Sequence, residues 1–356
     1  MVIKKRKTRQ VKIGNVKIGG NAPVSIQSMA KTDTADMQVT VSQIKALEQQ
    51  GCEIVRVAVK NMACARVLDK IKARIGIPIV ADIHFHFQLA LEAISRGVDG
   101  LRLNPGNIYR RSEIKQVVKM AKKKDIPIRV GVNSGSLRTS GKKKKIAGQM
   151  VKSALDYIKI LNDLDFYSII VSLKASDLLT TVQAYRMMAK KCDYPFHLGL
   201  TAAGPEDPGS LKSAIGLGVL LAEGIGDTIR VSLTADPNEE VKVARNILTA
   251  LKLRKDKIEI VSCPTCGRCE IELIKIVKQV KKRLNQLTIS DHCSPVKVAI
   301  MGCVVNGPGE ARDADVGLAG GRKSGIIFRK GKIVKKVGEK EMVDELVKEI
   351  LNPKKS

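Results

Sequence analysis

Aromatic residues are scarce in this 356-residue chain, which has no Trp, five Phe and five Tyr. Proteins that bind single-stranded nucleic acid stack the bases on aromatic rings, so the scarcity argues against that class. The chain also lacks an apolar run of about 18 residues, the length from which a membrane-spanning helix is suspected. Its basic start, MVIKKRKTRQ, has no apolar stretch of signal-peptide length behind it. We therefore expect a soluble protein of the cytoplasm.

Acidic residues are outnumbered, with 35 Asp and Glu against 63 Lys and Arg, a net charge of +28. Such an excess can attract nucleic acid or an anionic membrane. Here the lysines are spread over segments with helical periodicity, for example 122–124 and 142–145. We expect most of them to lie on solvated helix faces, and nucleic acid to be an unlikely partner.

Short apolar runs alternate with longer amphipathic segments from Val24 onward. There are eight such runs, at 24–29, 54–59, 79–83, 100–104, 128–133, 168–174, 196–201 and 228–233. Eight β-then-α units predict an α/β protein with a (β/α)8 TIM barrel. A doubly wound sheet is the alternative, but no G-x-G-x-x-G motif opens a helix. Residues 8–19 alternate about an Ile-Gly-Asn turn and predict a β-hairpin before the barrel.

The pattern changes after Leu253 and predicts a smaller α+β domain. Its expected elements are a strand at 258–262, a helix at 269–286, a strand at 296–301, a glycine-rich loop at 302–321, a strand pair at 325–337 and a helix at 339–351. The predicted domains are therefore 1–254 and 258–356.

Basic side chains interrupt five of the predicted barrel strands, and we expect them at the carboxyl ends, where the sites of such barrels lie. They are Arg56, Arg102, Arg129, Lys174 and Arg230, and the polar residues Asp82, His84, Asn104, Asn133 and Ser232 stand at or near the same level. A buried cation without a partner costs several kcal/mol, so five converging cations require anions. Asp82 could satisfy one of them, which leaves a site for a polyanion such as a diphosphate. Alternatively, individual side chains could point outward and pair with acidic residues on the helices.

The chain has eight cysteines, and one motif groups two of them as Cys263-Pro-Thr-Cys266. Cys303 follows a second apolar run, and a carboxylate comes at Glu310. Soft thiolates select zinc, copper(I) or an iron–sulfur cluster, and buried inert thiols are a further alternative. The glycines of GCVVNGPGE (302–310) favour the cluster, because they let backbone N–H groups approach inorganic sulfides.

The chain resembles the 4-hydroxy-3-methylbut-2-enyl diphosphate synthases of the methylerythritol phosphate pathway, which serves isoprene biosynthesis. The likeness spans nearly its whole length. Its motifs are QSM (27–29), VRVAV (55–59), ADIHF (81–85), LRLNPGN (101–107), RVGVNSGSL (129–137), VSLKASD (171–177), HLGLT (197–201), EGIGDTIRVSLTADP (223–237), SCPTCGR (262–268) and GCVVNGPGEA (302–311).

The resemblance implies that a [4Fe-4S] cluster is held by Cys263, Cys266, Cys303 and Glu310, with Glu310 as the exchangeable ligand. It implies two-electron reductive opening and dehydration of 2-C-methyl-D-erythritol 2,4-cyclodiphosphate. The expected substrate residues are Arg56, Arg102, Arg129, Asn133, Lys174, Arg230 and Ser232, together with Asp82 and His84. Asn306 is expected beside the cluster, with a catalytic role like that of Glu310. A reduced ferredoxin or flavodoxin would donate electrons, and a head-to-tail homodimer would complete the site.

Two positions depart from the family pattern. The family's T-E-A-G is Thr201-Ala202-Ala203-Gly204 here, so a carboxylate expected to move protons is missing and we expect impaired turnover. Glu206 is a less suitable substitute because it starts from a different loop position. Cys269 is an extra thiol, which we take to be a non-ligand at the start of a helix.

Two rival functions remain open from the residues alone. One is a zinc-ribbon barrel protein that binds RNA or another polyanion. The other is a phosphate-binding aldolase-type barrel with an idle appendage.

Overall fold

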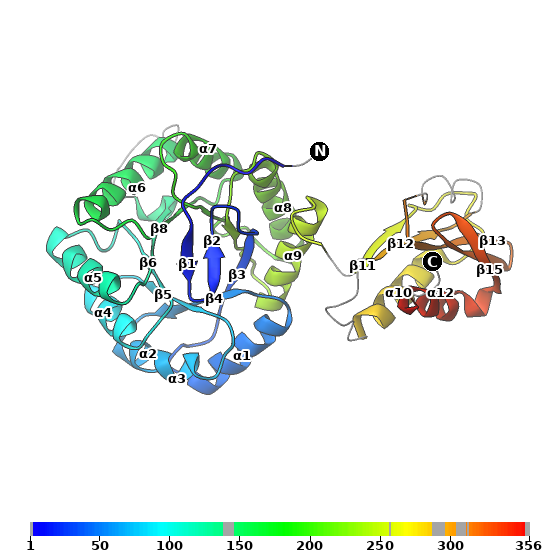
Figure 1. The fold of residues 1–356 in the computed structure, drawn as a ribbon, viewed down its shortest axis with the longest axis horizontal. Coiled ribbons are helices and arrows are strands. Elements are labelled where there is room, and N and C mark those ends of the chain that lie inside the picture. The colour runs from blue at the N-terminus through cyan, green and yellow to red at the C-terminus, as the bar shows by residue number, and fades with distance from the viewer. Residues whose placement is uncertain are drawn as a thin grey trace. The chain divides into compact units, whose positions relative to one another are not determined.

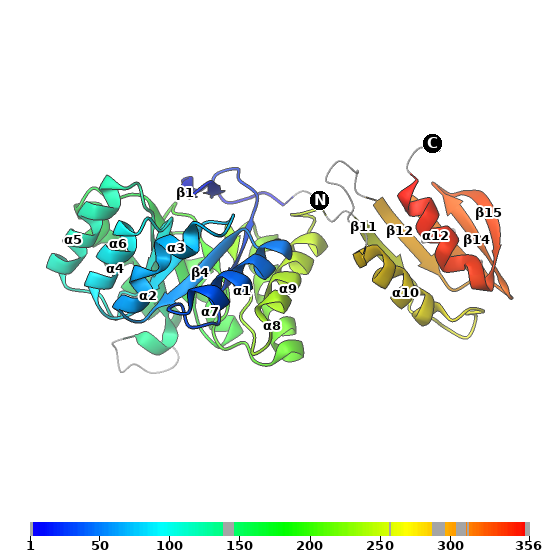
Figure 2. The same ribbon diagram turned by 90° about the horizontal axis from the view of Figure 1, so that it is seen from below.

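The computed structural model describes residues 3–137, 146–255, 258–286, 296–303, 311 and 313–352. The chain divides into two compact units, Met1–Arg254 and Lys255–Ser356. Figures 1 and 2 show the elements of both units, and each unit is considered by itself.

The first unit is a barrel of eight parallel strands. In chain order they are β3 (Ser25–Met29), β4 (Ile54–Val59), β5 (Ile79–Ile83), β6 (Gly100–Leu103), β7 (Ile128–Asn133), β8 (Ile169–Lys174), β9 (His197–Leu198) and β10 (Thr228–Ile229). The strands β3, β4, β5, β6, β7 and β8 pair in that order, β9 pairs with β10, and β10 pairs with β3. A parallel bridge from Val171 to Phe196 links β8 to the start of β9. The predicted TIM barrel is therefore confirmed, although β9 and β10 are much shorter than the runs that predicted them.

Helices form the outer ring of the barrel (Figure 1). They are α1 (Met37–Gln49), α2 (Met62–Arg66), α3 (Leu68–Lys72), α4 (Phe87–Ser95), α5 (Arg111–Lys123), α6 (Ile146–Asp163), α7 (Leu178–Ala189), α8 (Glu206–Ala222) and α9 (Pro237–Ala250). Helix α5 illustrates their patterning, because Ile114, Val117, Val118 and Ala121 are buried at i, i+3, i+4 and i+7. The lysines of α5 that follow Val118 lie on its solvent side, at 119, 122 and 123. Part of the positive charge thus lies on solvated helix faces, as expected.

A hairpin closes the amino-terminal end of the barrel. Strands β1 (Val11–Ile13) and β2 (Val16–Ile18) pair antiparallel, and Gly14 in their turn has φ +56°, which glycine adopts without strain. Val11, Ile13 and Ile18 pack on Ile54, Val80 and Ile170, which lie at the first or second positions of barrel strands. Because apolar side chains fill this end, a polar ligand has to enter from the carboxyl ends of the strands.

The second unit is a mixed five-stranded sheet with two helices. The sheet order is β11 (Ile258–Ser262), β12 (Val296–Met301), β13 (Val316–Gly321), β14 (Ser324–Arg329) and β15 (Lys332–Gly338). The first three strands are parallel and the last three antiparallel. Helices α10 (Leu273–Gln286) and α12 (Met342–Leu351) contribute Val280 and Leu346 to a core with Val298 and Leu318.

The glycine-rich residues of β13, VGLAGG, predicted a loop, and this prediction is wrong. The structure supplies a packing reason for one of these glycines. A side chain at Gly317 would place its Cβ 2.1 Å from the Phe328 ring on β14, so only glycine fits beneath that ring. Helix α10 also begins at Leu273, four residues later than expected. In the described part of the chain, no helix combines the length and the apolar character needed to cross a membrane.

Candidate functional site

Five basic side chains predicted to line a site come from five strands, or their immediate ends, in one barrel. Arg56 lies on β4, Arg102 on β6, Arg129 on β7 and Lys174 on β8, and Arg230 directly follows β10. Arg102, Arg129 and Lys174 are each 4% exposed. The side chains of Arg56 and Arg230 are 11% and 12% exposed. The five cations are therefore largely withdrawn from water.

Asp82 on β5 is a shared partner for two of these cations. Its Oδ1 lies 3.1 Å from Arg102 Nη1, and its Oδ2 lies 3.6 Å from Arg56 Nε. The register places Arg102 beside both Asp82 and Arg129 on the neighbouring strands. Burial opposes ionisation of Asp82, but Arg56, His84 and Arg102 outweigh it and hold the pKa of the carboxyl far below its usual range.

Glu240 on α9 is a second carboxylate of this cluster, and the sequence analysis missed it. It is 1% exposed, and its oxygens lie 3.4 Å from Arg230 Nη2 and 3.0 Å from Lys31 Nζ. The backbone N–H of Leu233 donates to it at 3.0 Å. In the sequence Glu240 resembles an ordinary acidic residue in the first turn of a helix, behind the cap residue Asp236.

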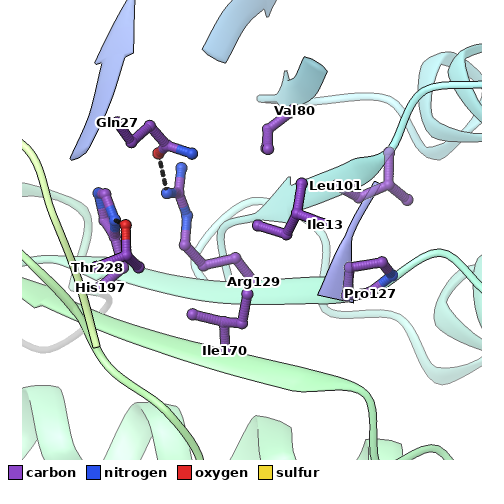
Figure 3. A pocket seen from close by; sticks show the side chains of 10 residues that line it. Ile13, Gln27, Val80, Leu101, Pro127, Arg129, Ile170, His197 and Thr228 are labelled. Atoms are coloured by element: carbon purple, nitrogen blue, oxygen red, sulfur yellow. Dashed lines mark hydrogen bonds between the residues drawn. The ribbon is translucent and has the colours of Figure 1, made fainter. Parts of the chain in front are cut away.

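Two of the cations have neutral partners. Arg129 Nη1 donates to Gln27 Oε1 on β3 at 2.5 Å, a contact drawn in Figure 3. Lys174 Nζ lies 3.2 Å from His197 Nε2 on β9. The five cations thus share two carboxylates, Asp82 and Glu240, among the residues that the structure describes.

Crowding and burial disfavour the charged forms of these groups. Burial, with the charges of Arg230 and Arg102, lowers the pKa of Arg56 to about 9 despite Asp82. Burial and the neighbouring arginines hold the pKa of Lys174 well below its ordinary value. The pKa values of Arg129 and His197 are lowered well below theirs by burial and nearby cations. A negatively charged ligand would therefore stabilise the charged forms of these buried groups.

Some of the cations lie farther from the carboxyl ends of their strands than predicted. Lys174 and Asn133 end their strands, but Arg129 is the second of six residues in β7 and Arg56 the third of six in β4. The prediction that all of them lie at the carboxyl ends is therefore wrong for Arg56 and Arg129. Inward-facing positions recur along the whole length of a barrel strand, so several layers can carry charge.

Two glycines make room for the deep cations. A Cβ at Gly131 would lie 2.4 Å from Arg102 Nε, and one at Gly199 would lie 2.6 Å from Lys174 Nζ. Glycines inside β7 and directly after β9 were a sequence signal for closely approaching groups that the sequence analysis did not use.

The remaining predicted residues of the barrel differ in their exposure and in their partners. His84 is half-exposed, with Nε2 at 3.5 Å from Asp82 Oδ2. Asn104 accepts hydrogen bonds from the Gly106 N–H and the Ser136 hydroxyl, so it braces the loop after β6. Asn133 and Ser232 are half-buried. Ala202, in the loop after β9, is exposed and has φ +52°, an unfavourable backbone conformation for alanine.

A small cavity lies below the cations, at the amino-terminal end of the barrel. Ile13 of the hairpin, Val80, Ile170 and Arg129 are among its lining residues (Figure 3). It has room for about one water molecule. The cavity is therefore too small to be the site of a diphosphate.

The cysteines predicted as ligands follow two neighbouring strands of the second unit. Cys263 comes directly after β11 and Cys303 shortly after β12, and these two strands pair in parallel. The Gly302 N–H donates to Cys263 Sγ at 3.3 Å, a contact that suits a thiolate. Cys266 is exposed, and hydrogen bonds from Arg268 lower the pKa of its thiol. This donor set fits a soft metal centre.

Three of the four predicted ligands, Cys263, Cys266 and Cys303, lie in the described part of the chain. Within the described ranges, no three His, Cys, Asp or Glu side chains gather closely enough to hold a metal ion. Glu310 and Asn306 lie outside those ranges. Cys269 precedes α10 by four residues, and its thiol donates to the Ile271 carbonyl at 3.2 Å.

Comparison with known proteins gives two family matches that together span the chain. The GcpE TIM-barrel domain matches residues 8–245, and the GcpE protein C-terminal domain matches residues 259–352. The 4-hydroxy-3-methylbut-2-en-1-yl diphosphate synthase (flavodoxin) of Thermodesulfovibrio yellowstonii is 54% identical, covering 98% of this chain and 99% of that relative. The protein of the same name from Geobacter sulfurreducens is 54% identical, covering 97% and 98%.

Two solved structures resemble a large part of the chain in fold. Dihydropteroate synthase from Stenotrophomonas maltophilia matches with a TM-score of 0.53 at 11% identity, covering 69% of this chain and 98% of that one. The enzyme from Xanthomonas albilineans matches with a TM-score of 0.52 at 10% identity, covering 69% and 97%. At such identities the likeness supports the fold only.

Proposed function

The chain belongs to the GcpE family, and we propose that it catalyses the reaction of its curated relatives as an iron–sulfur oxidoreductase. The substrate is 2-C-methyl-D-erythritol 2,4-cyclodiphosphate. Two electrons and two protons convert it to 4-hydroxy-3-methylbut-2-enyl diphosphate and water, a step of isoprene biosynthesis. The zinc-ribbon and aldolase-type alternatives receive no support from the relatives.

The barrel cations form the diphosphate site. The observation that carries this proposal is the imbalance of five buried cations against two carboxylates, Asp82 and Glu240. Arginine forks suit phosphate oxygens, and lysine adds a point charge. Asp82 fixes Arg56 and Arg102 before ligand arrives, so little ordering is needed on binding. Asn133, Ser232 and His84 add polar contacts around the substrate ring.

The second unit holds the [4Fe-4S] cluster. Cys263, Cys266 and Cys303 are the thiolate ligands, and Glu310 is the fourth, exchangeable ligand. When bound, the cluster supplies electrons one at a time. The Gly302 N–H donates to the Cys263 sulfur and stabilises its thiolate, and hydrogen bonds from Arg268 lower the pKa of the Cys266 thiol. Asn306 acts beside the cluster.

The assembly around the reaction follows from the family. Flavodoxin, which the relatives' names print, is the electron donor, with ferredoxin as the alternative. A head-to-tail homodimer brings the second unit of one subunit to the barrel of the other. A cytoplasmic location fits a protein whose thiolates must stay reduced.

Turnover of the chain as it stands is impaired at Ala202. The family's carboxylate at this position would move a proton, and an alanine methyl cannot. Glu206, at the start of α8, is a poor replacement because it belongs to the next helix. Substrate and cluster binding do not depend on Ala202.

Anaerobic purification tests the proposal. We expect a brown protein with about four irons per chain, and slow product formation from the cyclic diphosphate with reduced flavodoxin. Colourless protein with about one zinc per chain would contradict it.

A further inference from the structure

The barrel cations have two kinds of partner. Arg56 and Arg102 share Asp82, and Arg230 pairs with Glu240. Arg129 and Lys174 instead contact an amide and an imidazole. This division is unexpected for groups that are only 4% exposed, because buried cations are ordinarily matched by carboxylates.

Arg129 is held but not neutralised. Gln27, 2% exposed on β3, accepts from Arg129 Nη1 at 2.5 Å. Arg129 Nε and Nη2 are buried and have no hydrogen-bond partner among the described residues. Two donor atoms of this guanidinium therefore lack an acceptor among the described residues, and the unpaired charge favours an anion.

Lys174 is held in the same way by His197. Nε2 of the imidazole lies 3.2 Å from Lys174 Nζ, and Nδ1 lies 3.5 Å from the Thr228 hydroxyl. When Lys174 is charged it has only protons to give, so Nε2 then accepts and the proton of the neutral ring sits on Nδ1. Tyr185 fixes both strands, because its hydroxyl donates to the His197 carbonyl at 2.6 Å and accepts from the Leu173 N–H at 3.0 Å.

We propose that Gln27 and His197 are positioning residues that hold Arg129 and Lys174 through neutral acceptors, so that both positive charges stay available to the phosphates of the ligand. The inference rests on the proposed diphosphate site. A carboxylate at either position would fix its cation equally well but would also cancel its charge before the ligand arrived. Neutral acceptors fix the positions of Arg129 and Lys174 without cancelling their positive charges.

The near-isosteric substitution Gln27→Glu tests this separation. Inorganic pyrophosphate is the probe, its dissociation constant is measured by calorimetry, and thermal unfolding of the ligand-free protein is followed in parallel. We expect the midpoint temperature of thermal unfolding to rise by about 2–4 °C, because Arg129 gains an ion pair. The dissociation constant should increase at least about tenfold, because the same ion pair opposes phosphate. A merely structural role for Gln27 does not predict these opposite changes.

A matched control separates local from overall charge. Gln116→Glu makes the same change on the exposed face of α5 and should leave both quantities unchanged. Pyrophosphate binding by Gln27→Glu within twofold of the unsubstituted protein would overturn the inference.

A second pair covers the case in which Gln27→Glu fails to fold. His197→Asn and His197→Asp remove the same ring and differ in charge alone. The Asp variant should bind pyrophosphate at least about tenfold more weakly than the Asn variant. Equal affinities would overturn the role of His197. If the unsubstituted protein does not bind pyrophosphate, the proposed diphosphate site itself fails, which is a different result from equal binding by all variants.

Discussion

The two units differ in how far their candidate functional side chains are buried and hydrogen-bonded. In the barrel, Arg102, Arg129 and Lys174 are almost fully buried and already hold hydrogen-bond partners. In the second unit, Cys266 is exposed and Cys263 and Cys303 are half-buried beyond the ends of strands. A charged cradle can be preorganised by strands alone, whereas thiolates repel one another and close round a centre only when metal neutralises them. We therefore expect the barrel to bind anions without the cluster.

The substitution Cys303→Ser should break the second unit's function and leave the barrel's intact. If Cys303 is a ligand of the proposed cluster, loss of its thiolate should remove the iron, the brown colour and all turnover, since the proposed reaction takes its electrons from the cluster. Pyrophosphate affinity should stay unchanged. Iron analysis and calorimetry on the same sample measure both.

Cys269→Ser is the matched control for this thiol. It should keep the iron, because Cys269 directs its thiol to the Ile271 carbonyl. Iron loss in Cys269→Ser together with iron retention in Cys303→Ser would show that the ligand set is wrong.

The substitution Ala202→Glu sharpens the comparison at the barrel, where a chemical group is missing while binding groups are present. Restoring the carboxylate should raise turnover about a hundredfold, the lower range for a positioned proton-transfer group. Ala202→Gln matches it in size and should give no gain. Product formation with reduced flavodoxin measures the rates. Equal rates for Ala202→Glu and the unsubstituted chain would refute the explanation, and a further loss in Glu206→Gln would assign the residual activity to Glu206.

The sequence predicted the barrel more completely than its site. Eight β-α alternations identified the fold, and the cations at five strands indicated a common anion site. Glu240 escaped prediction because an acidic residue in the first turn of a helix is ordinary. The sequence does not show that this turn of α9 packs against Arg230, which lies 10 residues earlier in the chain.

The second unit was less predictable because its glycines can serve either in a loop or in a tightly packed strand. Those of β13 lie within a strand, and Gly317 is required by the Phe328 ring on the neighbouring strand. A single sequence does not distinguish such a packing glycine from a loop glycine. The motif CPTC and the later Cys303 did indicate the neighbouring strand ends, since both follow apolar runs.

The substitution Lys174→Met tests whether the barrel binds anions at the expense of its own stability. Removing a hydrogen bond to a charged group should weaken pyrophosphate binding by about tenfold to a hundredfold. The free energy of unfolding should not fall, because a buried charge without a carboxylate is lost with it. Lys115→Met, exposed on α5, removes the same charge from the surface and should change neither quantity. A clear loss of stability in Lys174→Met with unchanged affinity would contradict the cradle.

The smallest expected effect is a proton taken up when the barrel binds an anion. Burial and the neighbouring arginines lower the pKa of Lys174 in the free protein, and phosphate charge favours the ammonium form, so binding should raise that pKa again. Between the two pKa values the complex holds more protons than the free protein, and affinity should fall as pH rises, by at most about tenfold per pH unit for one proton. Calorimetry in buffers of different ionisation enthalpy measures the uptake. Pyrophosphate titrates too, so the Lys174→Met variant provides the baseline, and uptake equal to that baseline would show that Lys174 is already charged before the ligand arrives.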